Sequence, residues 1–219
     1  MVAVLLAGNA LAKTIPVTPN GPLTLQAAIA AASPGDVIEL QPGTYSGNVV
    51  LDKPLTLTGI GKPVIRGEDH GSVVTVTADG CTIQGLIIEH SGAMLVDEDS
   101  GILLKSNSNR IEHNQLRDVL FGIYLFGAGH NQIKDNVIRG RALPDLGERG
   151  SGIHIWNAGD NFIVDNTIIA ARDGMYLQNA HHSTIRGNRV SGLRYGLHYM
   201  YSNDNIFEDN VFDHNVAGA

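Results

Sequence analysis

The sequence has little of three things that commonly define a protein class: cysteine, positive charge and long apolar segments. Its 219 residues include one cysteine, Cys81, so no disulfide can form within the chain, and its apolar surroundings favour a core residue over a metal ligand. Lysine and arginine number 15 against 22 aspartates and glutamates, which leaves a formal charge of −7. That balance argues against nucleic acid or an anionic membrane as the main partner. No apolar run reaches the ~20 residues that a membrane-spanning helix needs.

What the sequence does have is a 22-residue repeat. Glycine and asparagine recur at this interval in its second half, at Gly152, Gly174, Gly196 and Gly218 and at Asn166, Asn188 and Asn210. Upstream, the step from Asn114 to Asn136 is again 22 residues, whereas the steps from Asn136 to Asn166 and from Gly122 to Gly152 are both 30. An insertion of eight residues between Ile138 and Gly152 accounts for the longer step.

Apolar and polar residues alternate within each repeat, around the pattern Asn-x-Ile-x-x-Asn-x-Ile, and this alternation is typical of β-strands. At roughly 3.3 Å per residue, 22 residues trace a coil of about 70 Å, enough for three short strands and three corners. The repeat therefore predicts an all-β fold, a right-handed parallel β-helix solenoid. Earlier, less regular strand-like runs lie at 37–40, 49–51, 55–58, 73–76 and 83–88.

The recurring asparagines are predicted to be scaffold residues. Stacked coils bring equivalent side chains to about 4.8 Å, so their amides can hydrogen-bond along the stack. Asparagine also tolerates the left-handed backbone of a tight corner. We therefore expect Asn114, Asn136, Asn166, Asn188 and Asn210 to form one column.

The two ends of the chain suggest a cap, a leader and an open terminus. Leu25, Ala28, Ile29 and Ala32 share one face of a short helix that would cover the first coil, with Thr24 as N-cap. Residues 1–12 resemble the remnant of a secretory signal peptide, and a buried first strand is the alternative interpretation. The β-helix domain is expected over residues 13–219, with a truncated carboxyl end, because Gly218 falls where another strand should begin.

A stripe of large side chains is predicted on the outside of the coils. Residues one and three places after each repeat glycine are apolar and should point inward, so those two and four places after it should point outward. The outward set includes the candidate partner surface Tyr124, Phe126, His154, Trp156, Tyr176, His198 and Met200, along with Leu103, Lys105 and Gln178. Such a stripe is typical of a contact surface, and its aromatic rings could equally stack on sugars.

Within that stripe, His198 and Met200 are the candidate metal ligands. They emerge on the same side of one strand about 7 Å apart, and imidazole with thioether suits copper, particularly Cu(I). His154 lies two coils away, roughly 10 Å, which is too far to share one ion with His198. The alternative is that these histidines are hydrogen-bonded surface residues. Residues 97–99, Asp-Glu-Asp, lack the spacing of a calcium loop and suggest a solvated loop.

Polysaccharide cleavage is the main competing function. Glycoside hydrolysis needs two carboxylates about 5 to 9.5 Å apart, and Asp135 and Asp165 occupy the same column of neighbouring coils. That column directly precedes the asparagine column, however, which indicates corner residues. The catalytic motifs of polygalacturonases and of alginate epimerases are not found in the sequence. A hydrolase or lyase is therefore the weaker interpretation.

Two runs in the repeats resemble a known family. Residues 193–205, Leu-Arg-Tyr-Gly-Leu-His-Tyr-Met-Tyr-Ser-Asn-Asp-Asn, and 151–157, Ser-Gly-Ile-His-Ile-Trp-Asn, are similar to the NosD family, as is the segment from Leu25 to Tyr45. The resemblance covers nearly the whole chain, although the Ser-Pro-Gly-Asp and Pro-Gly-Thr-Tyr motifs of that early segment occur in many β-helices.

The resemblance implies a periplasmic, non-enzymatic protein that assists assembly of the copper-sulfide cluster of nitrous oxide reductase, NosZ. It implies an ABC transporter, NosF and NosY, and the copper chaperone NosL as partners, with membrane association only through the transporter. It supplies no catalytic residues and no tightly bound cofactor, so copper would bind only transiently.

Overall fold

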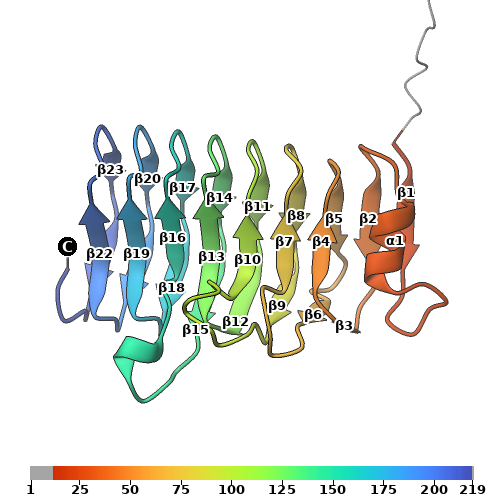
Figure 1. Cartoon of the computed structure of the whole chain (residues 1–219), viewed down its shortest axis with the longest axis horizontal. Helices are drawn as coiled ribbons and strands as arrows, with labels where there is room; N and C mark the ends of the chain where they lie inside the picture. Colours follow the sequence, from red (N-terminus) through yellow and green to blue (C-terminus); the bar gives the residue numbers. More distant parts are fainter. Residues whose placement is uncertain (1–11, 219) are drawn as a thin grey trace, which may run out of the picture.

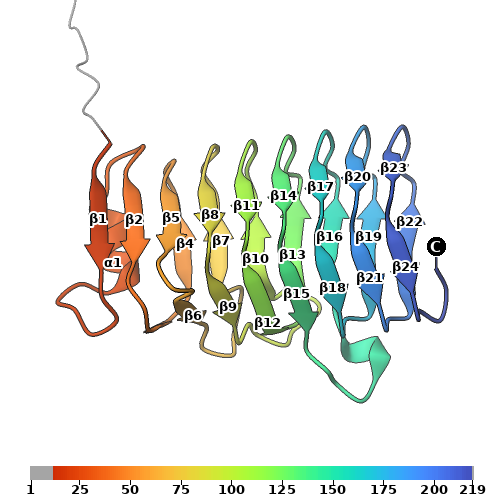
Figure 2. The ribbon, with the colours of Figure 1, turned by 180° about the vertical axis from the view of Figure 1, so that it is seen from behind.

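The computed structural model describes residues 12–218, which form a parallel β-helix built from three sheets (Figures 1 and 2). The sheets have nine, eight and seven strands, and the pairings between the strands are parallel throughout. The predicted fold is confirmed. The predicted signal remnant, residues 1–12, lies outside the described residues except for Ala12.

Each complete coil contributes one strand to each sheet in the order sheet 1, sheet 2, sheet 3. Sheet 1 contains β1 (Thr14–Val17), β2 (Val37–Leu40), β5 (Thr56–Gly59), β8 (Thr82–Gln84), β11 (Arg110–Glu112), β14 (Gln132–Lys134), β17 (Phe162–Val164), β20 (Thr184–Arg186) and β23 (Ile206–Glu208). Sheet 2 contains β3 (Thr44–Ser46), β6 (Val64–Arg66), β9 (Ile87–Glu89), β12 (Gln115–Val119), β15 (Val137–Gly140), β18 (Thr167–Ile169), β21 (Arg189–Ser191) and β24 (Val211–Asp213). Sheet 3 contains β4 (Val49–Leu51), β7 (Val74–Val76), β10 (Ser100–Leu104), β13 (Phe121–Phe126), β16 (Ile153–Trp156), β19 (Asp173–Gln178) and β22 (Tyr195–Met200).

The strand boundaries follow the sequence pattern in the regular coils, but β1, β3 and β6 lie in segments where no strand was predicted. The run 83–88, expected as a single strand, is divided into β8 and β9. Gly85 between them has a φ of +71°, a left-handed conformation that turns the chain from sheet 1 to sheet 2.

The core is a column of aliphatic side chains inside the coils. Ile123, Ile153, Met175 and Leu197 stand in register on successive strands of sheet 3. The first three are fully buried, and Leu197 is partly buried against the same core. The predicted inward positions are therefore confirmed at these four residues, whereas Tyr199, also predicted to point inward, is 40% exposed.

Asparagine ladders hold two of the three corners. Asn136 donates from both its backbone N and its Nδ2 to Oδ1 of Asn166, at 3.0 Å each, and Asn166 donates to Asn188 in the same way. This predicted column, which lies between sheets 1 and 2, is confirmed from Asn114 to Asn210. A second ladder, between sheets 3 and 1, contains Asn109, Asn131, Asn161, Ser183 and Asn205.

The left-handed backbone expected of the ladder asparagines belongs instead to the residue before each of them. His113, Asp135, Asp165 and Asp209 have φ values of +58°, +54°, +56° and +53°. The expectation is wrong because the asparagine must direct its side chain into the ladder, so the preceding residue makes the turn.

The repeat glycines are explained by close stacking. A Cβ on Gly174 would lie 2.1 Å from Cγ1 of Val190 and 2.6 Å from the carbonyl oxygen of Gly196 on the next coil. No side chain fits between the coils at this position, which is why glycine returns with the period of the coil.

The predicted cap is helix α1 (Leu25–Ala31), which lies over the first coils at one end of the solenoid (Figure 1). The Oγ1 of Thr24 accepts from the backbone N of Ala27, as expected of an N-cap. The side chain of Gln26 exchanges hydrogen bonds with the backbone N and O of Val50, at 2.8 and 3.5 Å. The helix therefore satisfies part of the free edge of β4, the last strand of sheet 3 on that side.

Two long loops leave the corner between sheets 2 and 3. Residues 90–99 connect β9 to β10, and residues 141–152 connect β15 to β16 and contain the 3₁₀ turn η1 (Leu146–Glu148). The second loop contains the insertion predicted from the 30-residue step, and it projects from the solenoid (Figures 1 and 2). Between residues 12 and 218, α1 is the sole α-helix and is far too short to cross a membrane.

Candidate functional site

The outer face of sheet 3 carries a ladder of stacked rings. Tyr124, His154, Tyr176 and His198 stand in register on β13, β16, β19 and β22. Their ring centroids are separated by 4.4, 4.5 and 4.5 Å in turn. The alternation rule thus places these four predicted outward residues in one continuous column, and the strand spacing brings their rings into contact.

This column is not exposed along its whole length. Leu103 and Tyr124 are 7% and 2% exposed, because Leu120 and Phe121 cover them in a second, outer hydrophobic cluster. The expectation of an exposed stripe is wrong at these two positions. Sequence alternation shows that a side chain leaves the coil, but it cannot show that a neighbouring corner folds back over it.

The loop 90–99 contributes to this cover. The hydroxyl of Tyr124 donates to Oε1 of Glu98 at 2.7 Å. Burial, and then the hydrogen bond to Glu98, raise the pKa of the Tyr124 phenol. The Oδ2 of Asp99, which is 3% exposed, accepts from the backbone N of Met94 at 2.9 Å. The interpretation of residues 97–99 as a solvated loop is therefore wrong for Glu98 and Asp99.

His154 is neutral in this environment. Burial, and then the nearby guanidinium of Arg172, lower its pKa from 6.5 to about 3. Its ring lies between those of Tyr124 and Tyr176 and meets Phe121 edge-on at 5.5 Å. Among residues 12–218, no group makes a hydrogen bond to its buried Nδ1 atom.

The second outward column lies beside the ladder and is more open. Phe126 and Trp156 stack at 4.6 Å, and the ammonium of Lys105 lies 5.6 Å from the centre of the Phe126 ring. Further along, the hydroxyl of Tyr176 lies 3.1 Å from Sδ of Met200 and 3.2 Å from Oε1 of Gln178. The two columns are thus joined through Tyr176.

A charged cluster that the sequence analysis missed lies next to His198. Asp173 is fully buried, and its carboxylate accepts from Nε and Nη2 of Arg194 at 2.9 and 2.7 Å. Arg172 lies at 3.3 Å, and Nδ1 of His198 at 3.5 Å, from Oδ2 of the same carboxylate. The hydrogen bond to Asp173 raises the pKa of Arg194. The 22-residue spacing of the two arginines was the available signal, since it predicts that they stack on successive coils.

The two candidate metal ligands are presented in different ways. The contact with Asp173 occupies Nδ1 of His198, so Nε2 is the ring nitrogen left for a ligand. His198 and Met200 lie on β22, and both contact Tyr176 on the neighbouring strand β19. In the part of the chain that the structure describes, no group of three or more His, Cys, Asp or Glu could enclose a metal ion. What this surface binds remains a prediction.

The candidate carboxylates for polysaccharide cleavage are corner residues. Asp135 and Asp165 both have positive φ, and Asp135 lies 3.4 Å from Nζ of Lys134 and 3.9 Å from Nδ1 of His113. Neither belongs to the ladder on sheet 3.

Comparison with known proteins begins with the fold. A family model described as the right handed beta helix region matches residues 65–219. The chain belongs to the right-handed β-helix family. Solved β-helix structures with low sequence identity share its architecture. An alginate lyase from Paenibacillus sp. aligns with a TM-score of 0.73 at 21% identity, covering 93% of this chain and 80% of the lyase. Pectate lyase Pel9A aligns with a TM-score of 0.71 at 19% identity, covering 85% and 55%.

Two sequence relatives of this β-helix are NosD proteins, which their names describe as ABC transporter binding proteins. The NosD of Pseudomonas aeruginosa is 34% identical over 137 residues, which is 62% of this chain and 32% of the relative. The NosD of Stutzerimonas stutzeri is 29% identical over 137 residues, or 62% and 31%. The β-helix is thus NosD-like, as predicted, although the matched region is 62% of the chain rather than nearly all of it, and it spans about a third of the length of these relatives.

Proposed function

We propose that this β-helix is a non-enzymatic factor that handles copper for the assembly of a copper-sulfide cluster in a partner reductase. The observation that carries the proposal is the outer ladder of sheet 3, which leads from the buried Tyr124 to His198 and Met200. The NosD-like sequence supports the same assignment.

The chemistry of the end of the ladder suits a transferred ion. An imidazole nitrogen and a thioether are soft ligands that favour Cu(I) over calcium or magnesium. Two donors hold copper less firmly than a closed set of four, so the ion can pass to a stronger site. Copper is then cargo rather than a tightly bound cofactor. The Asp173 carboxylate would keep Nδ1 of His198 protonated and Nε2 available.

The partners in this proposal are an ABC transporter, NosF and NosY, the copper chaperone NosL and the reductase NosZ, in the periplasm. The names of the relatives support the transporter, and the family resemblance supports the others. His154 and Tyr176 of the ladder, with Phe126 and Trp156 of the second column, would form the contact surface around the ion. Membrane association would arise only through the transporter.

The test replaces both His198 and Met200 by alanine in the full-length protein. We expect normal abundance, because neither side chain belongs to the core, but a partner reductase that lacks its complete cluster. The control pair is His182→Ala with His214→Ala, two exposed histidines at corners that do not belong to the ladder. A complete cluster in cells with the first pair would remove this surface from the mechanism.

A direct measurement uses Cu(I) alone, in competition with a chromogenic chelator. The unaltered protein should withdraw copper from the chelator, and the His198→Ala, Met200→Ala protein should do so at least tenfold more weakly. Equal affinities would show that these residues are not the ligands.

A carbohydrate-binding or polysaccharide-modifying protein is the second candidate, since Phe126 and Trp156 offer stacked aromatic rings on an open sheet. We propose that the chain lacks cleaving activity, because Asp135 and Asp165 are used as corners. A panel of uronans should therefore yield no new reducing or unsaturated ends. Activity that disappears in Asp135→Ala would establish the second candidate instead.

A further inference from the structure

The two long loops form an apolar hollow between them. It has a volume of about 480 Å³ and is lined by Ala93, Met94, Leu95, Val96, Leu143 and Glu148. Met94 is 55% and Val96 is 79% exposed, and Leu146 on the insertion is 38% exposed. Apolar side chains gathered at the tips of two separate loops are unusual for solvated surface and typical of a contact site.

An acidic hollow adjoins the apolar one. Its volume is about 570 Å³, and Ala93 and Met94 line both hollows, so these two residues form the ridge between them. Its charged lining consists of Asp69, Asp97 and Asp99 against Lys105, with His70 beside them. With histidine counted as neutral, the three carboxylates exceed the ammonium by two, or by one when Arg141, whose Nη2 lies 3.9 Å from Oδ1 of Asp69, is included. This hollow therefore favours a positively charged group.

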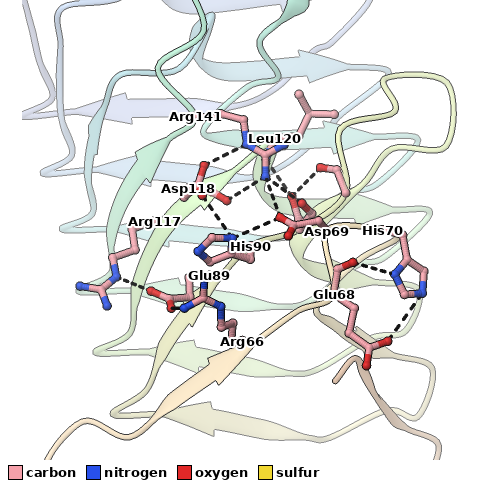
Figure 3. A network of polar contacts seen from close by, with 12 residues as sticks. Arg66, Glu68, Asp69, His70, Glu89, His90, Arg117, Asp118, Leu120 and Arg141 are labelled. Carbon is pink, nitrogen blue, oxygen red and sulfur yellow. Dashed lines mark hydrogen bonds and ion pairs between the residues drawn. The ribbon is translucent and has the colours of Figure 1, made fainter. Parts of the chain in front are cut away.

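The loops are held in place by a polar network at their base (Figure 3). Arg141 on the insertion donates from Nη2 to the carbonyl oxygen of Ser91 at 2.8 Å and from Nε to Asp118 at 2.9 Å. His90 lies between Asp69 and Asp118, at 3.2 and 3.5 Å from their carboxylates. Because Arg141 links both loops, their apolar tips are presented in a fixed arrangement.

The same network explains why negative charge predominates around the two hollows. The arginines of the insertion face inward, Arg141 to Asp118 and Ser91, and Arg149 to the carbonyl oxygen of Leu143. Glu148 lines the apolar hollow, and Asp97 lines the acidic one. The pair of hollows therefore offers apolar contact and negative charge side by side.

We propose that these two hollows, joined at Met94, are the docking site for a segment of another protein that carries an apolar side chain next to a lysine or arginine. The apolar side chain would occupy the hollow beside Val96 and Leu143, and the cation would lie in the hollow beside Asp69 and Asp97. A second copy of this chain is disfavoured, because a symmetric contact would bring the two acidic hollows together. An anionic membrane is disfavoured for the same electrostatic reason.

The test is photo-crosslinking in intact cells with the full-length protein. A benzoylphenylalanine at Val96 should give a discrete adduct with another protein, and the crosslinked peptide should contain lysine or arginine within a few residues of the adduct. The control places the same probe at Phe162 on sheet 1, an aromatic residue that is 51% exposed, and should not give that adduct.

Charge reversal supplies the second arm. Asp97→Lys with Glu148→Lys should reduce the yield of the Val96 adduct several-fold, whereas Asp204→Lys with Asp209→Lys, at exposed corners, should leave it unchanged. If the first pair folds poorly, Asp97→Asn with Glu148→Gln replaces it, with a smaller reduction expected. The proposal is overturned if Val96 gives no adduct, or gives adducts only with lipid or with a second copy of this chain. It is also overturned if the crosslinked peptide contains no lysine or arginine, or if the probe at Phe162 gives the same adduct. An adduct yield that is unchanged by the charge reversal would overturn it as well. None of these outcomes depends on copper binding at His198.

Discussion

The hydroxyl of Tyr176 donates a hydrogen bond to the sulfur of Met200 on the next coil, at a distance of 3.1 Å. The same tyrosine packs its ring on His198 at 4.5 Å. One residue thus orients both soft donors of β22, although thioether sulfur is a weak acceptor and the bond contributes little energy. Its effect is to reduce the number of conformations available to the flexible methionine side chain.

The asparagine ladder should be a large source of stability. In Asn166→Ala, the backbone N of Asn136 loses its acceptor, and the carbonyl oxygen of Ile133 loses a donor, in a buried position. We expect the free energy of unfolding to fall by about 2–4 kcal/mol, the range for several unsatisfied buried groups. Urea denaturation measures this, with Asn203→Ala at an exposed corner as the control. Equal midpoints for the two variants would contradict the ladder's role.

His154 should make the stability depend on pH. Its pKa is about 3 in the folded protein and 6.5 in the unfolded chain, so between these values only the unfolded chain is protonated. Stability is therefore lost as the pH falls from about 6.5 toward 3, at up to about 1.4 kcal/mol per pH unit.

Replacement of this histidine isolates its contribution. His154→Phe keeps an aromatic ring between Tyr124 and Tyr176 and removes the titrating group. The difference in unfolding free energy between the two proteins should change by about 2–3 kcal/mol between pH 6.5 and 4.5, and remain constant above pH 7. Denaturation curves across this range, with His182→Phe as the exposed control, provide the measurement. Parallel pH profiles for His154→Phe and the unaltered protein would show that His154 is not buried as described.

Asp173 should orient His198 as well as stabilise the coil. In Asp173→Asn, the guanidinium of Arg194 loses its charged partner, and we expect a loss of about 1–3 kcal/mol. Nitrogen chemical shifts of His198 report which ring nitrogen carries the proton at neutral pH. We expect protonation at Nδ1 in the unaltered protein and a mixture of the two forms in the variant. An unchanged tautomer would assign Asp173 a structural role alone, and Asp209→Asn is the control.

The fold was predictable because its main determinants are periodic. Asn114 and Asn136 differ by one coil, and the hydrogen bonds between them follow from that spacing alone. The spacing likewise predicts that Ile153 and Met175 stack inside the coil, and that the longer step before Gly152 contains an insertion. A 22-residue period places every such residue relative to its neighbours, without knowledge of the rest of the molecule.

The site was only partly predictable because its remaining determinants do not repeat. The stacking of Tyr124, His154, Tyr176 and His198 follows from strand register, but the cover over Tyr124 comes from Glu98 and Phe121, each unique in its coil. Likewise, the buried Asp173 is paired with Arg194 of the next coil, and no repeat of the aspartate marks this contact. Contacts between non-repeating residues require coordinates.

The three corners of the coil differ in how far the number of their residues can vary. From β10 onward, five residues join sheet 3 to sheet 1 in each coil, at 105–109, 127–131, 157–161, 179–183 and 201–205, and each segment ends at a rung of the Asn109 ladder. Two residues join sheet 1 to sheet 2, and each of these segments ends at a rung of the Asn114 ladder. An added residue at either corner would break a rung, whereas the third corner has lengths from one residue at 120 to twelve at 141–152. New recognition loops can therefore be acquired or grafted at the third corner without moving His154 or His198, so the molecule can change its partners while the stacked face stays the same.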